Sequence, residues 1–172
     1  MTTKPVPGST APHLEVETVS SDRWRLADQS PENLTMVVFY RGLHCPICKT
    51  YLRELEDKLE NFQGVGINAI AVSGDTQERA EQAKTDWGLE RLTVGYDFDI
   101  AAMRRWGLYI SPAASAGEPP LFGEPALFLV RPDKTLYYAA VNNAPWGRPQ
   151  LEDVLSGIEF ALAKDYPIRG TE

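Results

Sequence analysis

Apolar residues occur along the chain in two patterns: short unbroken runs, and longer stretches in which they recur every three or four positions. Unbroken runs bounded by turn residues are typical of strands covered on both faces, and the three-to-four spacing is typical of amphipathic helices. The runs predict strands at residues 36–41 and 67–72, a short strand from about 92, and an antiparallel pair over 126–130 and 135–141. The spacing predicts helices from Cys45 to Gly64, over 77–87, from about 99 to 107, and from near 149.

The order of these elements indicates one α/β domain. A strand, helix, strand, helix sequence with short joints favours a sheet that has a parallel element. Residues 1–13 are rich in Thr, Pro, Ser and Gly and have no period, so we expect a flexible tail there and a single domain over 14–172. Residues 111–124, dense in Pro, Ala and Gly, predict a long loop of the kind that is often functional.

Two helix details follow from the same pattern. Asp75 and Glu78 have the spacing of a helix-capping pair, with Asp in place of Ser or Thr. The last predicted helix has one apolar stripe, which we expect to face the core and which consists of Leu151, Val154, Leu155, Ile158 and Leu162.

Both cysteines of the chain lie in the stretch FYRGLHCPICKTYLRELE, at the junction between the first long strand and its helix. Pro46 suits the first helical position, because its missing N–H would have no partner there. The free N–H groups and the dipole at a helix N-terminus favour an anion, so the pKa of the Cys45 thiol is expected to be low. Cys45 is then the nucleophile, and Cys48, one turn further on, resolves the product as a disulfide.

Arg41 and His44 precede Cys45 and are candidates to support it. Each could add positive charge beside the thiolate. Neighbouring side chains can also point apart, and His44 has the alternative of packing as a ring without a redox role.

Composition limits the partners. The formal net charge is −7 and no Lys/Arg cluster stands out, so we expect no nucleic-acid binding. The sequence has no apolar run of about 18 residues for a membrane helix and no secretory signal pattern, and we expect a cytoplasmic protein without membrane contact. A close cysteine pair in a reducing compartment is more often catalytic or metal-binding than structural.

Two other interpretations of the cysteine pair remain open. A zinc site needs about four ligands, and only His13 and His44 are available beside the cysteines, so we expect no metal. The pair could also be inert and buried in the core. Redox chemistry of this kind requires no organic cofactor.

In this order, the motifs resemble those of the thioredoxin superfamily, and within it the alkyl hydroperoxide reductase and thiol-specific antioxidant family, the peroxiredoxins and their relatives. The similar stretches are MVVFYRGLHCPICK, INAIAVSGDTQERAEQAKTDWGL and YDFDIAAMRRWGL, within about residues 16–140. The resemblance implies a thioredoxin-like fold with a central mixed β-sheet flanked by α-helices. It also implies a thiol reductant such as thioredoxin or glutathione, and a homodimer as one possible state.

The chain departs from the family pattern at two places. Family peroxidases have a Pro and a Thr or Ser ahead of the reactive cysteine, where this chain has Val38 and Gly42. They also resemble one another in an Arg before the late strand, where this chain has Pro125. Pro125 looks like the cis-proline of thioredoxins, with an ordinary trans turn before the strand as the alternative. Glu124 is then expected to face the site, where its charge would oppose thiolate formation.

These features predict a thiol oxidoreductase whose favoured substrate is a disulfide, with hydroperoxide reduction as the alternative. Trp146 and Arg148, in the loop before the last helix, are candidates for substrate or partner contact, although Arg148 could equally stabilise the loop. A hypothesis from another class is a non-catalytic binding module that uses residues 111–124 and 146–149 as its contact surface.

Overall fold

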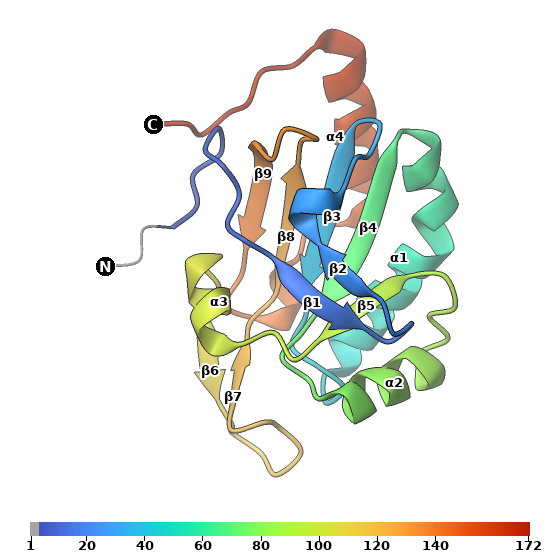
Figure 1. Ribbon diagram of the computed structural model, residues 1–172, viewed down its shortest axis with the longest axis vertical. Coiled ribbons are helices and arrows are strands. Elements are labelled where there is room, and N and C mark those ends of the chain that lie inside the picture. Colours follow the sequence, from blue (N-terminus) through green and yellow to red (C-terminus); the bar gives the residue numbers. More distant parts are fainter. Residues whose placement is uncertain (1–3) are drawn as a thin grey trace.

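A computed structural model describes residues 4–172, and Figure 1 shows its central sheet with helices on both faces. The sheet has seven strands in the order β2-β1-β5-β4-β3-β8-β9. These strands are β1 (Glu15–Thr18), β2 (Arg23–Arg25), β3 (Leu34–Phe39), β4 (Ile67–Val72), β5 (Thr93–Tyr96), β8 (Ala126–Val130) and β9 (Leu136–Val141). The helices are α1 (Pro46–Gly64), α2 (Gln77–Asp86), α3 (Ile100–Arg105) and α4 (Leu151–Lys164), with 3-10 turns η1 (Leu26–Asp28) and η2 (Pro145–Gly147).

Strand β3 is the centre of this sheet. It pairs in parallel with β4 and antiparallel with β8, so the sheet is mixed, as expected. All of its residues are buried, which explains the unbroken apolar run in its sequence. Because side chains alternate along a strand, Met36 and Val38 face one core while Val37 and Phe39 face the other.

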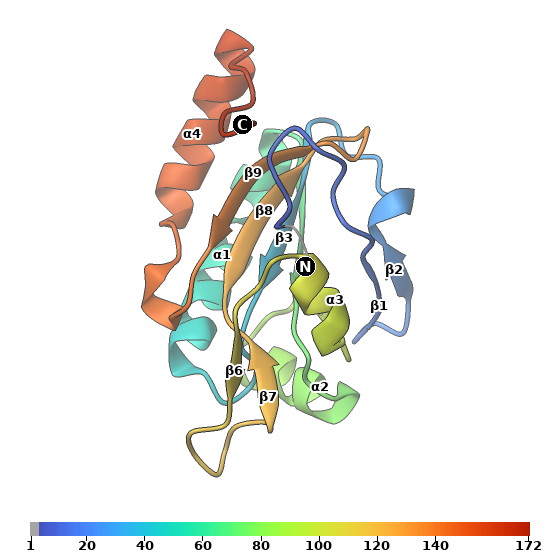
Figure 2. The same ribbon diagram turned by 90° about the vertical axis from the view of Figure 1, so that its left-hand side faces the viewer.

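The two cores have different coverings. The first lies under α1, α2 and α4 and includes both cysteines. The second lies under α3 and the N-terminal segment, as Figure 2 shows from the side. There the ring of Phe39 stacks on Phe98 at 5.4 Å and meets Trp106 at the same centroid distance. Trp106 is fully buried, and its Nε1 donates to the carbonyl of His13 at 3.2 Å.

The N-terminal segment is attached to the sheet from Gly8 onward. The Gly8 N–H donates to the Leu136 carbonyl at 2.8 Å, and the Ala11 N–H donates to the Lys134 carbonyl at 2.9 Å. We expected a flexible tail over 1–13 and did not predict these contacts, because the segment has no regular spacing of apolar residues that would indicate a strand or a helix. Residues 1–3 of that predicted tail lie outside the described residues.

Three local predictions need correction. The loop over 111–124 contains a small hairpin, formed by β6 (Ile110–Pro112) and β7 (Leu121–Gly123). The cap of α2 is Thr76, whose hydroxyl accepts the Arg79 N–H, because the Asp75 carboxylate is engaged elsewhere. Leu162 is 43% exposed, since the last turn of α4 extends beyond the sheet. Within residues 4–172, no helix is both long and apolar enough to cross a membrane.

A buried carboxylate joins α1 to the loop before β5. Glu56 is 7% exposed, and its two oxygens accept the backbone N–H groups of Arg91 and Leu92 at 2.9 and 2.8 Å. Arg91 also donates to the Glu56 carbonyl at 3.0 Å. Burying two N–H groups without partners would cost free energy, so Glu56 fixes how α1, and with it the cysteine pair, lies on the sheet.

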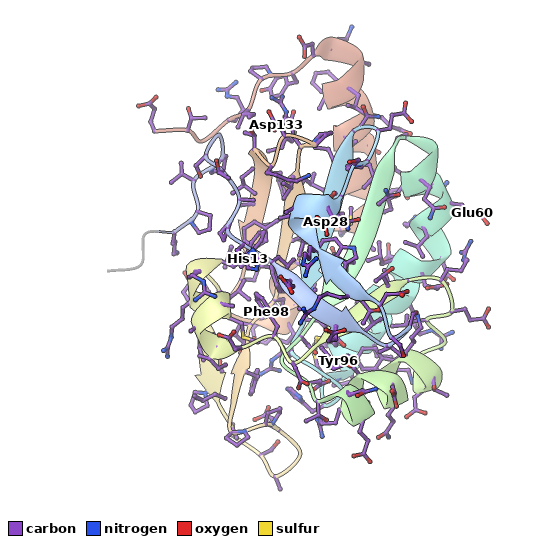
Figure 3. All side chains as sticks on the ribbon, in the orientation of Figure 1. His13, Asp28, Glu60, Tyr96, Phe98 and Asp133 are labelled. Atoms are coloured by element: carbon purple, nitrogen blue, oxygen red, sulfur yellow. A yellow bond between two sulfur atoms is a disulfide. The ribbon has the colours of Figure 1, made fainter. Side chains whose placement is uncertain are left out.

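We therefore expect Glu56→Ala to lower the free energy of unfolding by about 2 kcal/mol or more, because two buried donors lose their acceptors. Urea denaturation measures this loss. The matched control is Glu60→Ala, which removes the other carboxylate bound to Arg91 but whose side chain is 79% exposed and points away from the fold in Figure 3. It should cost about 0.5 kcal/mol or less. Equal losses in both variants would contradict the role assigned to Glu56.

Candidate active site

Strand register brings four loops together where β3, β4 and β9 end and β8 begins. We call this end of the strands the active-site edge of the sheet. Phe39, at the end of β3, pairs with Val72 at the end of β4 and with Ala126 at the start of β8. Ala126 in turn pairs with Val141 at the end of β9. The candidate residues therefore meet at this edge on the segments 41–45, 73–75, 124–125 and 142–149.

The cysteines lie at the start of α1, as the sequence predicts. Cys45 is the N-cap, Pro46 follows in the first turn, and the Cys45 Sγ accepts the Cys48 N–H at 3.2 Å. The two sulfurs are joined in a disulfide with a Cα–Cα distance of 5.2 Å. Both cysteines are buried, at 1% and 0% exposure. An N–H donor and the helix dipole thus act on Cys45, the arrangement that favours a thiolate when the bond is reduced.

Arg148 contacts the other sulfur. Its Nη2 donates to the Cys48 Sγ at 2.9 Å, and its Nη1 donates to the Pro145 carbonyl at 2.9 Å. Figure 2 shows the η2 turn, in orange, beside the N-terminal end of α1. The sequence singled out Arg148 as a substrate contact or a loop stabiliser, and the contact with Cys48 was not foreseen. The two residues are 100 positions apart, and no local spacing relates them.

Tyr51 holds this arginine in place. The guanidinium carbon lies 5.0 Å from the centre of the Tyr51 ring, and the Tyr51 hydroxyl donates to the Pro149 carbonyl at 2.7 Å. Burial lowers the pKa of Arg148 to about 10, an effect that Tyr51 and Glu124 oppose. Arg148 is therefore a cation at neutral pH. Burial also raises the pKa of Tyr51, so its hydroxyl stays protonated.

Arg41 is paired with Glu124 instead of facing the site as a free cation. The Arg41 Nε lies 3.1 Å from Glu124 Oε2, and a second carboxylate, of Glu118, lies 3.8 Å from its Nη2. Ser111 donates to Glu124 Oε1 at 2.6 Å. The expected positive charge of Arg41 and the expected negative charge of Glu124 thus largely cancel.

The imidazole ring of His44 packs against the ring of Phe122. Its centroid is 4.8 Å from that of Phe122, and neither ring nitrogen has a hydrogen-bond partner within the described residues. Burial, followed by the nearby charge of Arg41, lowers the pKa of His44. The imidazole is therefore neutral near pH 7 and supplies no positive charge.

Asp75, which is 2% exposed, positions the loop before Cys45, a role that the sequence did not suggest. Its Oδ2 accepts the Leu43 N–H at 2.7 Å, and its Oδ1 lies 3.2 Å from the Nε of Arg79. Gly42 has φ +138°, and a Cβ at that position would lie 2.6 Å from Asp75 Oδ1. Only glycine lets the loop approach this carboxylate so closely. The signal in the sequence was an acid in the short turn after a buried parallel strand.

Pro125 differs from the expectation. Residues 4–172 contain no cis peptide bond, so the likeness of Pro125 to a cis-proline is wrong. Strand β8 begins directly after Pro125, and the Pro125 carbonyl accepts the Asn142 N–H at 3.0 Å.

Two large apolar side chains are exposed near the cysteines. Trp146, on η2, is 78% exposed, and Ile47, between the two cysteines, is 43% exposed. Both cysteines are almost fully buried, so these two side chains are the large apolar groups exposed on the segments that carry and contact the disulfide. Within the described part of the chain, no group of three or more His, Cys, Asp and Glu side chains is arranged to hold a metal ion.

Known proteins were compared with this chain. The model of the AhpC/TSA family matches residues 7–139. A protein of Mycobacterium tuberculosis named as a peroxiredoxin is 25% identical over 130 residues, which cover 76% of this chain and 77% of that protein. The 1-Cys peroxiredoxin PER1 of Arabidopsis thaliana is 25% identical over 158 residues, covering 90% and 70% of the two chains.

A solved structure of a peroxiredoxin-like protein from Aquifex aeolicus superimposes with a TM-score of 0.75 at 17% identity, covering 92% of this chain and 88% of that one. This likeness confirms the thioredoxin-like fold. With the dithiol at the start of α1 and a family match over most of the domain, the chain belongs to the AhpC/TSA family, and it is a thiol-dependent enzyme of that family.

Proposed function

We propose that the protein is a dithiol oxidoreductase that cycles between a Cys45–Cys48 disulfide and two thiols, with a disulfide as its favoured substrate. The observation that supports this most directly is the pair itself: Cys45 is the N-cap of α1 and Cys48 follows one turn later, with their sulfurs already joined.

The proposed reaction proceeds in two exchanges. The Cys45 thiolate attacks one sulfur of the substrate disulfide, that S–S bond breaks, and one substrate thiolate leaves. The Cys48 thiolate then attacks the Cys45 sulfur, and the second substrate thiolate leaves. The substrate is reduced by two electrons and the enzyme holds a disulfide, which an external thiol reductant opens by the same chemistry.

The surroundings of Cys45 favour a disulfide over a peroxide. Among residues 4–172, the hydrogen bond given to the Cys45 sulfur comes from the Cys48 backbone, while Val38 and Gly42 offer no hydroxyl to position a peroxide. Arg41, on the loop before Cys45, is bound to Glu124. Attack on a disulfide sulfur needs a thiolate, which this site provides without further donors, and a leaving thiolate, which comes from the substrate disulfide itself.

Hydroperoxide reduction is the second candidate function, and the family match supports it. In that reaction the Cys45 thiolate attacks the outer peroxide oxygen, the O–O bond breaks, and an alcohol or water leaves while Cys45 becomes a sulfenic acid. Cys48 then forms the disulfide and releases water. The same reductants serve both reactions.

For partners, we propose a thioredoxin-type protein or glutathione as the reductant, acting in the cytoplasm. The matched proteins named as peroxiredoxins support a reductant of this class. Trp146 and Ile47 offer an apolar approach to the disulfide for a protein partner. A homodimer is part of the proposal only by analogy with the family.

Stopped-flow tryptophan fluorescence of the reduced protein tests the substrate. We expect oxidation by hydrogen peroxide to be no faster than that of a small thiol with the same pKa, and oxidation by glutathione disulfide or a protein disulfide to be at least about tenfold faster than with that thiol, because the helix N-terminus activates Cys45. Peroxide oxidation far above the small-thiol rate would reject the disulfide preference and establish the peroxidase.

Two variants control this experiment. Cys45→Ser should abolish the fast phase, whereas Cys48→Ser should retain it and accumulate a mixed disulfide on Cys45 that mass spectrometry detects. A protein in which both cysteines can be replaced by Ser without loss of function would instead be the non-catalytic binding module.

The packing of His44 predicts how stability depends on pH. Burial lowers the pKa of His44 in the folded protein below its ordinary value of about 6.5. The unfolded chain then binds a proton more readily, so stability is complete above this value and falls as the pH is lowered through it.

We expect His44→Phe to reduce the loss of stability on going from about pH 7.5 to about pH 5.5, because phenylalanine keeps the contact with Phe122 and does not titrate. Urea denaturation at the two pH values measures this change. His13→Gln, which removes the exposed histidine, is the matched control and should keep the wild-type dependence. An unchanged dependence in His44→Phe would show that His44 does not titrate as its packing implies.

A further inference from the structure

Arg148 is a cation without an acidic partner. Within the described residues, no Asp or Glu oxygen lies within 4.0 Å of its guanidinium, although the other arginines at this edge, Arg41 and Arg79, each have a carboxylate. The partners of Arg148 are the Cys48 sulfur, the Pro145 carbonyl and the face of Tyr51, and its enclosed Nε has no hydrogen-bond partner. Burying a cation in this way is costly unless a negative charge forms beside it.

The atom that can supply this charge is the Cys48 sulfur, 2.9 Å from Nη2. We propose that Arg148 stabilises Cys48 as a thiolate, so that Cys48 is both the leaving group when the disulfide is opened and the charged attacker when it is closed. This inference rests on the proposed dithiol cycle and assigns Arg148 to the reaction as a residue that touches a reacting atom.

In the reductive step, the thiolate of the reductant attacks the Cys45 sulfur and the Cys45–Cys48 bond breaks. The electron pair goes to the Cys48 sulfur, where the Nη2–H of Arg148 donates to it while the proton stays on the arginine. A thiolate with a lower pKa leaves faster, so this contact accelerates reduction. In the closing step the same contact keeps Cys48 charged while Cys45 is bonded to substrate and carries no charge.

The two sulfurs are thus served by different donors. Cys45 has the N–H groups at the start of α1, and Cys48 has Arg148. The charged and titratable groups that act on Arg148 are Tyr51, Glu124 and Arg41. Tyr51 keeps its proton because burial raises its pKa, and Glu124 and Arg41 are paired with each other. The charge of Arg148 therefore remains available to Cys48.

The test uses Cys45→Ser protein, in which residue 45 stays uncharged, as in the mixed disulfide. The NMR chemical shift of the Cys48 Cβ is followed against pH in this protein and with Arg148→Met added. We expect a Cys48 pKa below the ordinary value of about 8.5, rising by about one unit or more when Arg148 is replaced. An equal pKa in the two proteins would overturn the proposal.

Arg131→Met, added to Cys45→Ser, is the matched control. Arg131 lies 5.1 Å from the centre of the Tyr137 ring, as Arg148 lies over Tyr51, but it has no hydrogen bond to a sulfur. The Cys48 pKa should be unchanged in this protein. An increase equal to that caused by Arg148→Met would overturn the proposal, because any lost arginine would then have the same effect.

A second measurement needs no change at Arg148. In the Cys45→Ser protein, the side-chain nitrogen signals of Arg148 should shift with pH at the midpoint given by Cys48, because the two groups are in contact. Signals that stay constant through the Cys48 titration would overturn the proposal even if Arg148→Met failed to fold. Neither measurement uses turnover, so a failure here is distinguishable from a failure of the proposed function, which the reaction of Cys45 with substrates decides.

Discussion

Strand β3 is buried on both faces and paired on both edges, and the position of every candidate residue depends on that pairing. The register with β4 and β8 places the end of β3, the end of β4 and the start of β8 at one edge of the sheet. A shift by one residue would turn the side chains of β3 to the opposite cores. Phe39 would then lose its contacts with Phe98 and Trp106, so the packing of particular side chains holds the register. The cysteine loop, the Asp75 turn and the Arg148 loop meet as a consequence.

Two of the three arginines at this edge are paired with a carboxylate, and the third is not. The third contacts a sulfur that reacts in the proposed cycle. Arg41 and Arg79 are each neutralised by a buried carboxylate, of Glu124 and Asp75. Such pairs position loops, because their charges are already satisfied. Arg148 differs, since its nearest partner with the capacity to become an anion is a sulfur. The arginines that position loops are thus paired with carboxylates, whereas the arginine that contacts the Cys48 sulfur has no carboxylate partner.

The sequence predicted the main elements and the place of the dithiol, because apolar period, Pro46 and the strand-to-helix junction are local signals. The mixed sheet and the thioredoxin-like fold followed from the order of the elements and the family resemblance. The contacts across the sheet were beyond local patterns: Arg148 with Cys48, Asp75 with the Leu43 N–H, and Arg41 with Glu124. The cis-proline expectation failed because a motif position does not determine the peptide isomer.

The family match covers most of the domain and ends before the loop that carries Arg148. The family model matches residues 7–139, which contain the fold, the dithiol and the paired arginines, whereas Trp146 and Arg148 come after the matched segment. Within the matched segment Cys45 lies at a helix N-terminus, and the loop after β9, outside that segment, carries the arginine that contacts the second sulfur. Among the described residues, this chain has no hydroxyl and no unpaired arginine at Cys45. The unpaired arginine of this edge, Arg148, contacts Cys48 instead, one helical turn away. In the proposed cycle, breaking and re-forming the bond between these two sulfurs would use that charge in both directions, because Cys48 would carry the negative charge whenever the bond is open and Cys45 is covalently occupied.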